Sequence, residues 1–367
     1  MQAVDVLIVG AGVIGAAVAE TLSRAGAFRI MLCERGTPGC EASNAAAGVL
    51  AVASGQARKG VLLELRRVSG AMFPAWVDRL CDETGIDVGY RASGVLSLAC
   101  SDAEVAGLRE LVEHRRSQGM RCEWLDAAAV RAVEPAVHPD IRGAALFPDD
   151  HSVDSARLVA ALVAAAVRRG VALRDGAAVH ALVPGPDSVR VAVGDDVIDA
   201  GIVVVAAGAW SCDLLLDLGV RIPVRPARGE MAALTPVGCA VRHTLMAGDG
   251  YVVPHGDEVL VGSTTAFVGF DKQVTAAGVA ALRAHAAALV PAFAAVPFTR
   301  TWAGLRPCST IRRPIIARLP GAPRVIVATG HHRNGVLLAP ATARLVADLV
   351  TGAPPVVSLA PFVYRRH

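Results

Sequence analysis

The sequence predicts an α/β protein in which a mostly parallel sheet is interrupted by an inserted α+β domain with antiparallel strands. Short apolar, β-branched runs that end in glycine indicate strands buried on both faces of a parallel sheet. Stretches with an alternating strand pattern lie between those runs and indicate the insertion. The chain has 367 residues, 53% of them hydrophobic and only 19% charged, which is enough for two domains and excludes a disordered chain.

The charge balance and the cysteines exclude several classes of protein. A net charge of +3 and 4% aromatic residues give no indication of a nucleic-acid partner. The eight cysteines include no C-x-x-C pair or Cys/His cluster with zinc spacing, so we expect neither a disulfide framework nor a metal. The start of the chain lacks the features of a signal peptide, and the apolar run Val6–Ala19 is shorter than the about 20 residues that a bilayer span needs. We therefore expect a cytoplasmic protein without a membrane partner.

The first forty residues carry the strongest local pattern. Asp5–Val9 predicts a buried strand, followed by the glycine motif Gly10–Gly15 (GAGVIG) and a helix over Ala16–Arg24. A second strand, Arg29–Cys33, ends at Glu34. Strand, G-x-G-x-x-G, helix, strand and acidic residue in this order are typical of a dinucleotide-binding, Rossmann-type unit.

Each residue of this motif has a physical role to fill. Gly10 permits the tight turn, Gly12 lets a pyrophosphate approach the backbone, and Gly15 lets the helix pack on the strand. The unpaired N–H groups at the start of the helix favour the phosphates. Glu34 is placed to accept hydrogen bonds from ribose hydroxyls.

A run of small residues, Glu41–Leu50, comes shortly after the acidic residue. The small side chains of Ala45–Gly48 would let backbone N–H groups pass close to a bound cofactor. The alternative interpretation of this run is the start of an alanine-rich helix.

Later segments divide between the two domains. Two apolar strands, Val203–Val205 and Val325–Ala328, lead to Gly208 and Gly330, and both belong with the parallel sheet. Asp154 is expected to cap a helix that ends at Gly170 in the same domain. The elements expected in the insertion are a strand over Ala92–Leu98, a helix over Ser101–Gln118 with a Ser101/Glu104 capping box, antiparallel strands over Tyr251–Pro254 and Glu258–Ser263, and a helix over Val274–Val290.

Several motifs together resemble the D-amino-acid-oxidase-like FAD-dependent oxidoreductases, and within them the glycine oxidases of thiamine biosynthesis. The resemblance runs from Asp5 to about Leu349. The stretches that carry it are Gly10–Gly15, Glu34, Ser43–Leu50, Tyr90–Leu98, Val203–Ser211, Pro226–Glu230 and, most specifically, Gly330–Pro340 (GHHRNGVLLAP).

The resemblance implies a Rossmann-type FAD-binding domain of the GR2-like kind, formed by residues 1–85, 146–222 and 312–367. Residues 86–145 and 223–311 would form the substrate-binding domain. It implies FAD as cofactor, with a helix that begins at Gly335 directing its N–H groups at the flavin. The residues expected to bind FAD are Gly10, Gly12, Val13, Ile14, Gly15, Glu34, Arg35, Ser43, Asn44, Ala46, Ala47, Gly48, Val179, Ala207, Gly208, Trp210, Gly330, His332, Arg333, Asn334, Gly335, Val336 and Leu337.

The resemblance also implies oxidative deamination of glycine or another small amino acid, with hydride passing from Cα to flavin N5. Dioxygen would take up the electrons and give hydrogen peroxide, leaving an imine product. Arg306 is expected to hold the substrate carboxylate with its planar fork. Tyr251 would reach the same carboxylate, and Arg333 would lie at the mouth of the site. The expected partners are a small amino acid and O2, in a homo-oligomer.

Two departures from the family pattern bear on the substrate. His332 stands where the family usually has an aromatic residue, and we favour a packing role for His331 and His332 over proton handling. Arg312 and Arg313 replace an acidic residue beside the expected site, so a larger or more acidic amino acid is an alternative. Cys308 lies in the same stretch; a plain free thiol is favoured over a covalent flavin link.

Two other functions remain open at this point. One is an amino-acid dehydrogenase that acts on a D-amino acid or a sarcosine-like substrate and passes electrons to a quinone or a partner protein. The other is a flavin-binding subunit of a larger complex.

Overall fold

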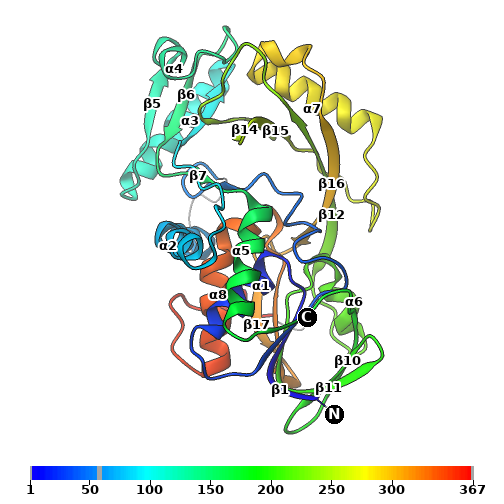
Figure 1. The fold of residues 1–367 in the computed structure, drawn as a ribbon. Helices are drawn as coiled ribbons and strands as arrows, with labels where there is room; N and C mark the ends of the chain where they lie inside the picture. The colour runs from blue at the N-terminus through cyan, green and yellow to red at the C-terminus, as the bar shows by residue number, and fades with distance from the viewer. Residues whose placement is uncertain (1, 56–59, 365–367) are drawn as a thin grey trace.

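Two eight-stranded sheets lie at opposite ends of the molecule, in a computed structural model that describes residues 2–55 and 60–364 (Figure 1). The sheet at the bottom of the view contains the strands that the glycine motif predicts. The sheet at the top carries most of the inserted segments. Two long strands on the right of the view, β12 (Val224–Leu234) and β16 (Arg300–Ser309), extend from the upper sheet toward the lower one.

The lower sheet is parallel around its central strand. β1 (Gln2–Val9) lies between β11 (Asp196–Val205) and β2 (Ile30–Cys33) and runs parallel to both. β18 (Ala322–Thr329) pairs parallel with β11, and β8 (Ala172–Arg174) with β2. The antiparallel additions are β17 (Ile315–Leu319), β9 (Val179–Pro184) and β10 (Val189–Val193).

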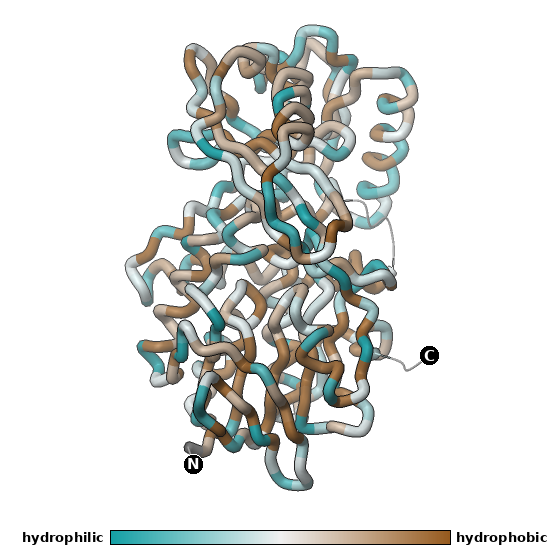
Figure 2. The backbone as a smooth tube through the Cα atoms, turned by 90° about the vertical axis from the view of Figure 1, so that its right-hand side faces the viewer, coloured by the Kyte–Doolittle hydropathy of each residue, from teal (hydrophilic) through white to brown (hydrophobic). Residues whose placement is uncertain are grey.

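The lower sheet is covered on both faces, which explains why its strands are continuously apolar. Val6 and Ile8 of β1 pack into the core beneath the helices, and Leu7 and Val9 pack into the core on the opposite face. In Figure 2 the hydrophobic stretches of the tube are prominent in the strands of the lower part. The helices on the first face are α1 (Val13–Ser23), α2 (Val61–Thr84), α5 (Ser155–Arg168) and α8 (Gly335–Thr351), and the short helix α6 (Ser211–Leu216) belongs to the opposite face.

The upper sheet is antiparallel except for one parallel pair, β4 with β13. α7 (Ala276–Leu289) packs on it through Leu282, Ala286 and Leu289. α3 (Asp102–Ser117) and α4 (Ala127–Val133) accompany its outer strands. In order, its strands are β16 (Arg300–Ser309), β12 (Val224–Leu234), β15 (Glu258–Gly262), β14 (Gly250–His255), β13 (Thr244–Ala247), β4 (Val95–Ala99), β6 (Gly143–Phe147) and β5 (Glu123–Asp126).

The segments of the two proposed domains can be located on these sheets. The lower sheet draws its strands from the proposed FAD-binding segments, and the upper sheet from the proposed substrate-binding segments. The proposed boundary between residues 145 and 146 falls inside β6, so the chain leaves the upper sheet two residues later. A small two-stranded sheet pairs β3 (Val49–Leu50) with β7 (His151–Ser152).

Local capping signals hold in the structure. Ser101 and Glu104 form the reciprocal capping box of α3, and Asp154 accepts hydrogen bonds from two backbone N–H groups at the start of α5. Gly170 ends that helix with a left-handed φ of +90°. α1 begins at Val13 rather than Ala16, because the last glycine of the motif lies inside the helix.

One long helix has no counterpart among the elements expected from the sequence. The sequence pattern does not identify α2, which contains Gly70 and Pro74. These two residues disfavour a helix by local propensity, and packing against α5 and α8 overrides that preference. Among the helices of residues 2–55 and 60–364, none combines the length and the apolar character needed to cross a membrane.

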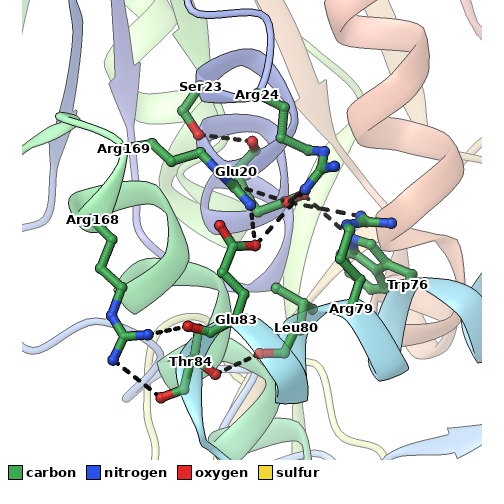
Figure 3. Close-up of polar contacts among 10 residues, drawn as sticks. All are labelled: Glu20, Ser23, Arg24, Trp76, Arg79, Leu80, Glu83, Thr84, Arg168 and Arg169. Atoms are coloured by element: carbon green, nitrogen blue, oxygen red, sulfur yellow. Dashed lines mark hydrogen bonds and ion pairs between the residues drawn. The ribbon is translucent and has the colours of Figure 1, made fainter.

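A buried carboxylate ties three of the lower helices together (Figure 3). Glu20 on α1 is 0% exposed and accepts hydrogen bonds from Trp76 Nε1 on α2 at 3.3 Å and from Arg169 Nη1 after α5 at 3.1 Å. Arg24 and Arg79 also lie within ion-pair distance of its carboxylate, at 3.6 and 3.7 Å. A buried charge with this many partners is stable only while the partners remain.

Candidate active site

Three glycine-containing segments meet at one edge of the lower sheet. Val9 pairs with Val205, and Val205 pairs with Val327, so β1, β11 and β18 direct their carboxyl ends to the same side. The residues that follow these strands are 10–15, 206–210 and 330–335. In open α/β sheets, ligands bind outside the carboxyl ends of the strands.

The glycine motif makes a turn that larger residues would obstruct. Gly10 has a φ of +96°, and a Cβ there would lie 2.7 Å from the Ala206 carbonyl oxygen. A Cβ at Gly15 would lie 1.8 Å from the Gly10 carbonyl oxygen, so the first turn of α1 packs directly on the loop. Gly12 is different, because its nearest neighbour would be Ser43 Oγ at 3.3 Å. Its surface is therefore free for close approach of a ligand to the backbone.

Two expected cofactor residues are fixed by backbone hydrogen bonds. Ala11 N donates to Glu34 Oε2 at 2.8 Å, and Gly36 N donates to Glu34 Oε1 at 3.1 Å. Val13 N donates to Ser43 Oγ at 2.9 Å. The carboxylate and the hydroxyl therefore both lie next to the backbone at the start of α1, where a nucleotide would bind.

The small-residue run after Glu34 forms turns, so its alternative interpretation as a helix start is wrong. Trp302 Nε1 donates to the Ala45 carbonyl oxygen at 3.4 Å, and a Cβ at Gly304 would lie 2.3 Å from Ala45 Cβ. A Cβ at Gly48 would lie 1.7 Å from the Val153 carbonyl oxygen. Small residues are needed here because β16 of the upper sheet passes directly against this segment.

Arg35 and Trp210 lie together in a surface cluster. The Arg35 guanidinium lies 3.6 Å from the centre of the Trp210 ring and pairs with Glu41 at 2.6 Å. Trp210 stacks on Phe270 with ring centres 5.4 Å apart. Val179, another expected cofactor residue, is the first residue of β9, close to Ala177, whose N–H donates to the Glu34 carbonyl oxygen at 2.9 Å.

His331 packs inside the lower domain. It is 3% exposed, and its Nε2 lies 3.1 Å from Thr342 Oγ1 on α8. Burial lowers the pKa of His331 to about 3, so the ring is neutral at ordinary pH. This geometry agrees with the expected packing role.

His332 occupies a less ordinary position. Its φ is +51°, in the left-handed region, and its buried Nε2 has no hydrogen-bond partner in the described part of the chain. Burial, together with the charges of Arg306 and Arg333, lowers the pKa of His332 to about 4. The neutral imidazole therefore lies beside both arginines that the sequence assigns to the site.

Arg306 is a partly buried cation without a carboxylate partner among the described residues. It lies on β16, and its Nη1 donates to the Thr264 carbonyl oxygen at 3.0 Å. A Cβ at Gly229 would lie 2.0 Å from this nitrogen, so glycine on the neighbouring strand makes room for the guanidinium. Burial lowers the pKa of Arg306, the Tyr251 hydroxyl opposes this shift and Arg333 adds to it.

The other two expected site residues complete the cluster. Tyr251 lies on β14 with its hydroxyl 3.2 Å from Met231 Sδ, and its ring lies over Gly262, where a Cβ would approach within 2.4 Å. Arg333 precedes α8 and pairs with Asp249 at 3.1 Å. Three elements distant in sequence thus bring a tyrosine and two arginines together.

The arginine pair Arg312–Arg313 does not have the place at the pocket that its sequence position suggested. Both side chains lie on the exposed turn between β16 and β17, and Arg313 Nε donates to the Pro361 carbonyl oxygen at 2.5 Å. The pair therefore gives no support for a larger or more acidic substrate. Cys308 is a free, partly buried thiol whose backbone pairs with His331.

Two residues that support this cluster are not among the site residues expected from the sequence. Glu230 is buried on β12, and its carboxylate accepts a hydrogen bond from Thr264 Oγ1 at 2.7 Å. Thr264 is the residue whose carbonyl oxygen holds Arg306. Glu230 ends the stretch Pro226–Glu230 that carries part of the family resemblance, but no pattern marks it as a site residue, and Thr264 has no sequence signal.

Comparison with known proteins gives a consistent result. Residues 5–349 match the family model described as FAD dependent oxidoreductase. Glycine oxidase of Geobacillus kaustophilus is 34% identical, over 99% of this chain and 97% of the relative, and its crystal structure superposes with a TM-score of 0.96 over 100% of both chains. A bifunctional protein ThiO/ThiG of Nostoc sp. is 33% identical over 99% of this chain and 55% of its own length. The crystal structure of iminodiacetate oxidase from Chelativorans sp. BNC1 is 27% identical, with a TM-score of 0.91 over 98% of both chains. The chain belongs to the family of FAD dependent oxidoreductases.

Proposed function

We propose that this enzyme oxidises the amine of glycine or another small amino acid with one carboxylate, and that dioxygen is the electron acceptor. The observation that carries the proposal is Arg306, a partly buried guanidinium beside Tyr251 with no carboxylate partner among the described residues. A cation of this kind is stabilised when a ligand supplies the missing anion. The glycine oxidase relatives support the choice of substrate class.

The residues at the sheet edge fit the FAD that the family requires. Gly12 offers a surface where only Ser43 Oγ lies near, and Gly15 lets α1 begin next to the loop. The first N–H groups of α1 favour a pyrophosphate, and Glu34 retains lone pairs for ribose hydroxyls. Gly330 and the start of α8 belong to the third segment at this sheet edge.

The charges favour a single carboxylate on the substrate. Arg333 already pairs with Asp249, which leaves Arg306 as the uncompensated charge of the cluster. His332 is neutral, so it adds no further positive charge. A dicarboxylic substrate would lack a second unpaired cation in this cluster.

Each protein group then has a definite task. The planar fork of Arg306 would take up both carboxylate oxygens, and Tyr251 would direct its hydroxyl at one of them. This fixes the substrate Cα with respect to the cofactor. When bound, FAD supplies the hydride-accepting chemistry; the N-terminus of α8 offers it N–H groups and a positive dipole end.

Two alternatives differ in the electron acceptor or the assembly. A dehydrogenase would share every feature of this site, because the acceptor is not chosen by the carboxylate-binding residues. A subunit of a larger complex would need partner chains for turnover, whereas we propose that this chain acts as a homo-oligomer of identical subunits.

A substrate screen tests the proposal. The purified holoenzyme is mixed without oxygen with glycine, sarcosine, D-amino acids and iminodiacetate, and the visible flavin absorbance is followed. Bleaching by small monocarboxylic amino acids, followed by hydrogen peroxide formation in air, is the expected result. Bleaching without peroxide, but with rapid reduction of a dye, would replace the oxidase by a dehydrogenase. No bleaching with any of these compounds would refute the amino-acid substrate.

A further inference from the structure

The segment between β15 and α7, residues Thr264–Thr275, contacts both arginines of the proposed site. The Thr264 carbonyl oxygen accepts a hydrogen bond from Arg306 Nη1 at 3.0 Å. Thr265 Oγ1 accepts one from Arg333 Nη2 at 2.9 Å. Two consecutive residues of this segment, which we call the 264–275 loop, therefore orient two guanidinium groups that come from different parts of the chain.

Glu230 holds the first residue of this loop from two sides. Thr264 Oγ1 donates to Glu230 Oε2 at 2.7 Å, and Glu230 N donates to Thr264 Oγ1 at 3.0 Å. The Thr264 hydroxyl thus both donates and accepts. The backbone N–H of Thr264 also donates to the Glu230 carbonyl oxygen at 3.3 Å. These three bonds to Glu230 fix the hydroxyl and the backbone N–H of Thr264, and its carbonyl is held in place as a result.

The same carboxylate anchors the far end of the loop. Thr275 N and Thr275 Oγ1 donate to Glu230 Oε1 at 2.6 and 2.8 Å. Glu230 is 3% exposed, and a Cβ at Gly278 on α7 would lie 2.1 Å from its carboxylate. Burial raises the pKa of Glu230, but the hydrogen bonds from Thr264 and Thr275 outweigh it, so the pKa lies below its ordinary value. The anchor is therefore ionised at working pH.

The middle of the loop is attached to the lower domain and to β12 of the upper sheet. Phe270 stacks on Trp210, and Lys272 Nζ lies 3.1 Å from Glu41. Asp271 pairs with Arg228 on β12 at 2.6 Å. The exposed loop is thus fixed at both ends and in the middle, which limits the movement of its contacts with the arginines.

We propose that Glu230 and Thr264 are positioning residues for the substrate carboxylate: the buried Glu230 carboxylate fixes the Thr264 hydroxyl, and the Thr264 carbonyl sets the orientation of the Arg306 guanidinium. Neither residue touches the substrate in this arrangement. Both residues act on the substrate by orienting Arg306. Changing them should therefore affect binding of the substrate carboxylate and leave the cofactor site unchanged. The inference rests on the proposed function, which assigns the carboxylate to Arg306.

The test compares Thr264→Val with Thr264→Ser. Valine keeps the backbone carbonyl and the shape of threonine but removes the hydroxyl, whereas serine retains the hydroxyl. Thr299→Val is the matched control, because Thr299 Oγ1 also donates to a glutamate, Glu258 at 2.8 Å, next to the far end of β16. Holoenzymes are titrated with acetate, which has a carboxylate but no amine to oxidise, and the flavin spectrum reports binding. The KM and kcat for glycine and the thermal midpoint are measured in parallel.

We expect Thr264→Val to weaken acetate binding and raise the KM for glycine about three- to tenfold, as loss of one or two hydrogen bonds that orient a ligand would. Its kcat and FAD content should stay close to wild type, Thr264→Ser should restore binding, and Thr299→Val should bind acetate normally. Normal acetate binding by Thr264→Val overturns the positioning role while the proposed function stands. If Thr299→Val weakens acetate binding equally, the positioning role is overturned too, because the loss of binding would then reflect a general loss of stability. If the wild type binds no acetate and oxidises no glycine, the proposed function fails and the positioning role fails with it.

Discussion

Replacing Arg306 by methionine should separate substrate binding from folding. The guanidinium donates a hydrogen bond to the Thr264 carbonyl oxygen and has no carboxylate partner among the described residues, so N–H groups remain for a carboxylate of the ligand. A bidentate carboxylate would form two charge-assisted hydrogen bonds, each worth about 1.5–3 kcal/mol. Their loss amounts to about 3–6 kcal/mol, or a decrease in kcat/KM of about 10²- to 10⁴-fold. The KM should take most of this change, because the carboxylate is held alike in the ground state and the transition state.

The same variant should bind substrate less well but be at least as stable as the wild type. Burial lowers the pKa of Arg306, which means that the protein interior disfavours its charge, and no carboxylate among the described residues compensates. Methionine fills a similar space without a charge, so we expect the thermal midpoint of Arg306→Met to equal or exceed that of the wild type.

Steady-state kinetics, flavin content and thermal unfolding check both halves of this prediction. Arg306→Lys is the control: it keeps the charge but loses the planar fork, so its kcat/KM should lie between those of the wild type and Arg306→Met. An unchanged KM in Arg306→Met would remove Arg306 from the substrate site. A thermal midpoint several degrees below the wild type would show that the arginine stabilises the fold.

Three further predictions concern the lower domain. Gly12→Val should fold, because the new side chain meets only Ser43 Oγ. It should purify without yellow FAD, because the side chain covers the backbone that the pyrophosphate approaches, and a variant fully loaded with FAD would contradict this. Glu20→Gln should lower the free energy of unfolding by about 2–4 kcal/mol in urea titrations, since Arg24, Arg79 and Arg169 lose their shared anion; an unchanged midpoint would contradict the role of Glu20. Stability should fall as pH decreases from about 6.5 to about 3, because His331 takes up a proton only when unfolded; His331→Gln should reduce this slope by up to about 1.4 kcal/mol per pH unit, and an unaltered slope would show that His331 is not its source.

The cofactor half of the protein could be predicted from the sequence because its signals are local. The strand, the glycine motif, the helix and Glu34 follow one another within 30 residues, and the backbone geometry of each step depends on its own residue types. The caps at Ser101 and Asp154 are local in the same sense, because each side chain bonds to an N–H group two or three residues later. Such patterns predict a structure without knowledge of the rest of the chain.

Local propensity misled where tertiary packing opposed it. α2 contains a glycine and a proline, and it is a helix because its apolar face packs on α5 and α8. Arg312 and Arg313 lie close to Arg306 along the sequence, yet the turn after β16 directs Arg313 at the C-terminal segment. Nearness along the sequence does not place side chains at the same site once a turn lies between them.

The sequence by itself determined the family pattern, the FAD-binding unit and the three residues expected at the substrate site. Only the tertiary structure decided which of the two site arginines, Arg306 or Arg333, is unpaired, because that depends on carboxylates brought near by other segments. Asp249 compensates Arg333, three arginines converge on Glu20, and Arg306 is left with the Thr264 carbonyl, which Glu230 holds through the Thr264 hydroxyl. A charge is paired or unpaired according to distances of a few ångströms across the fold, and sequence spacing does not contain those distances.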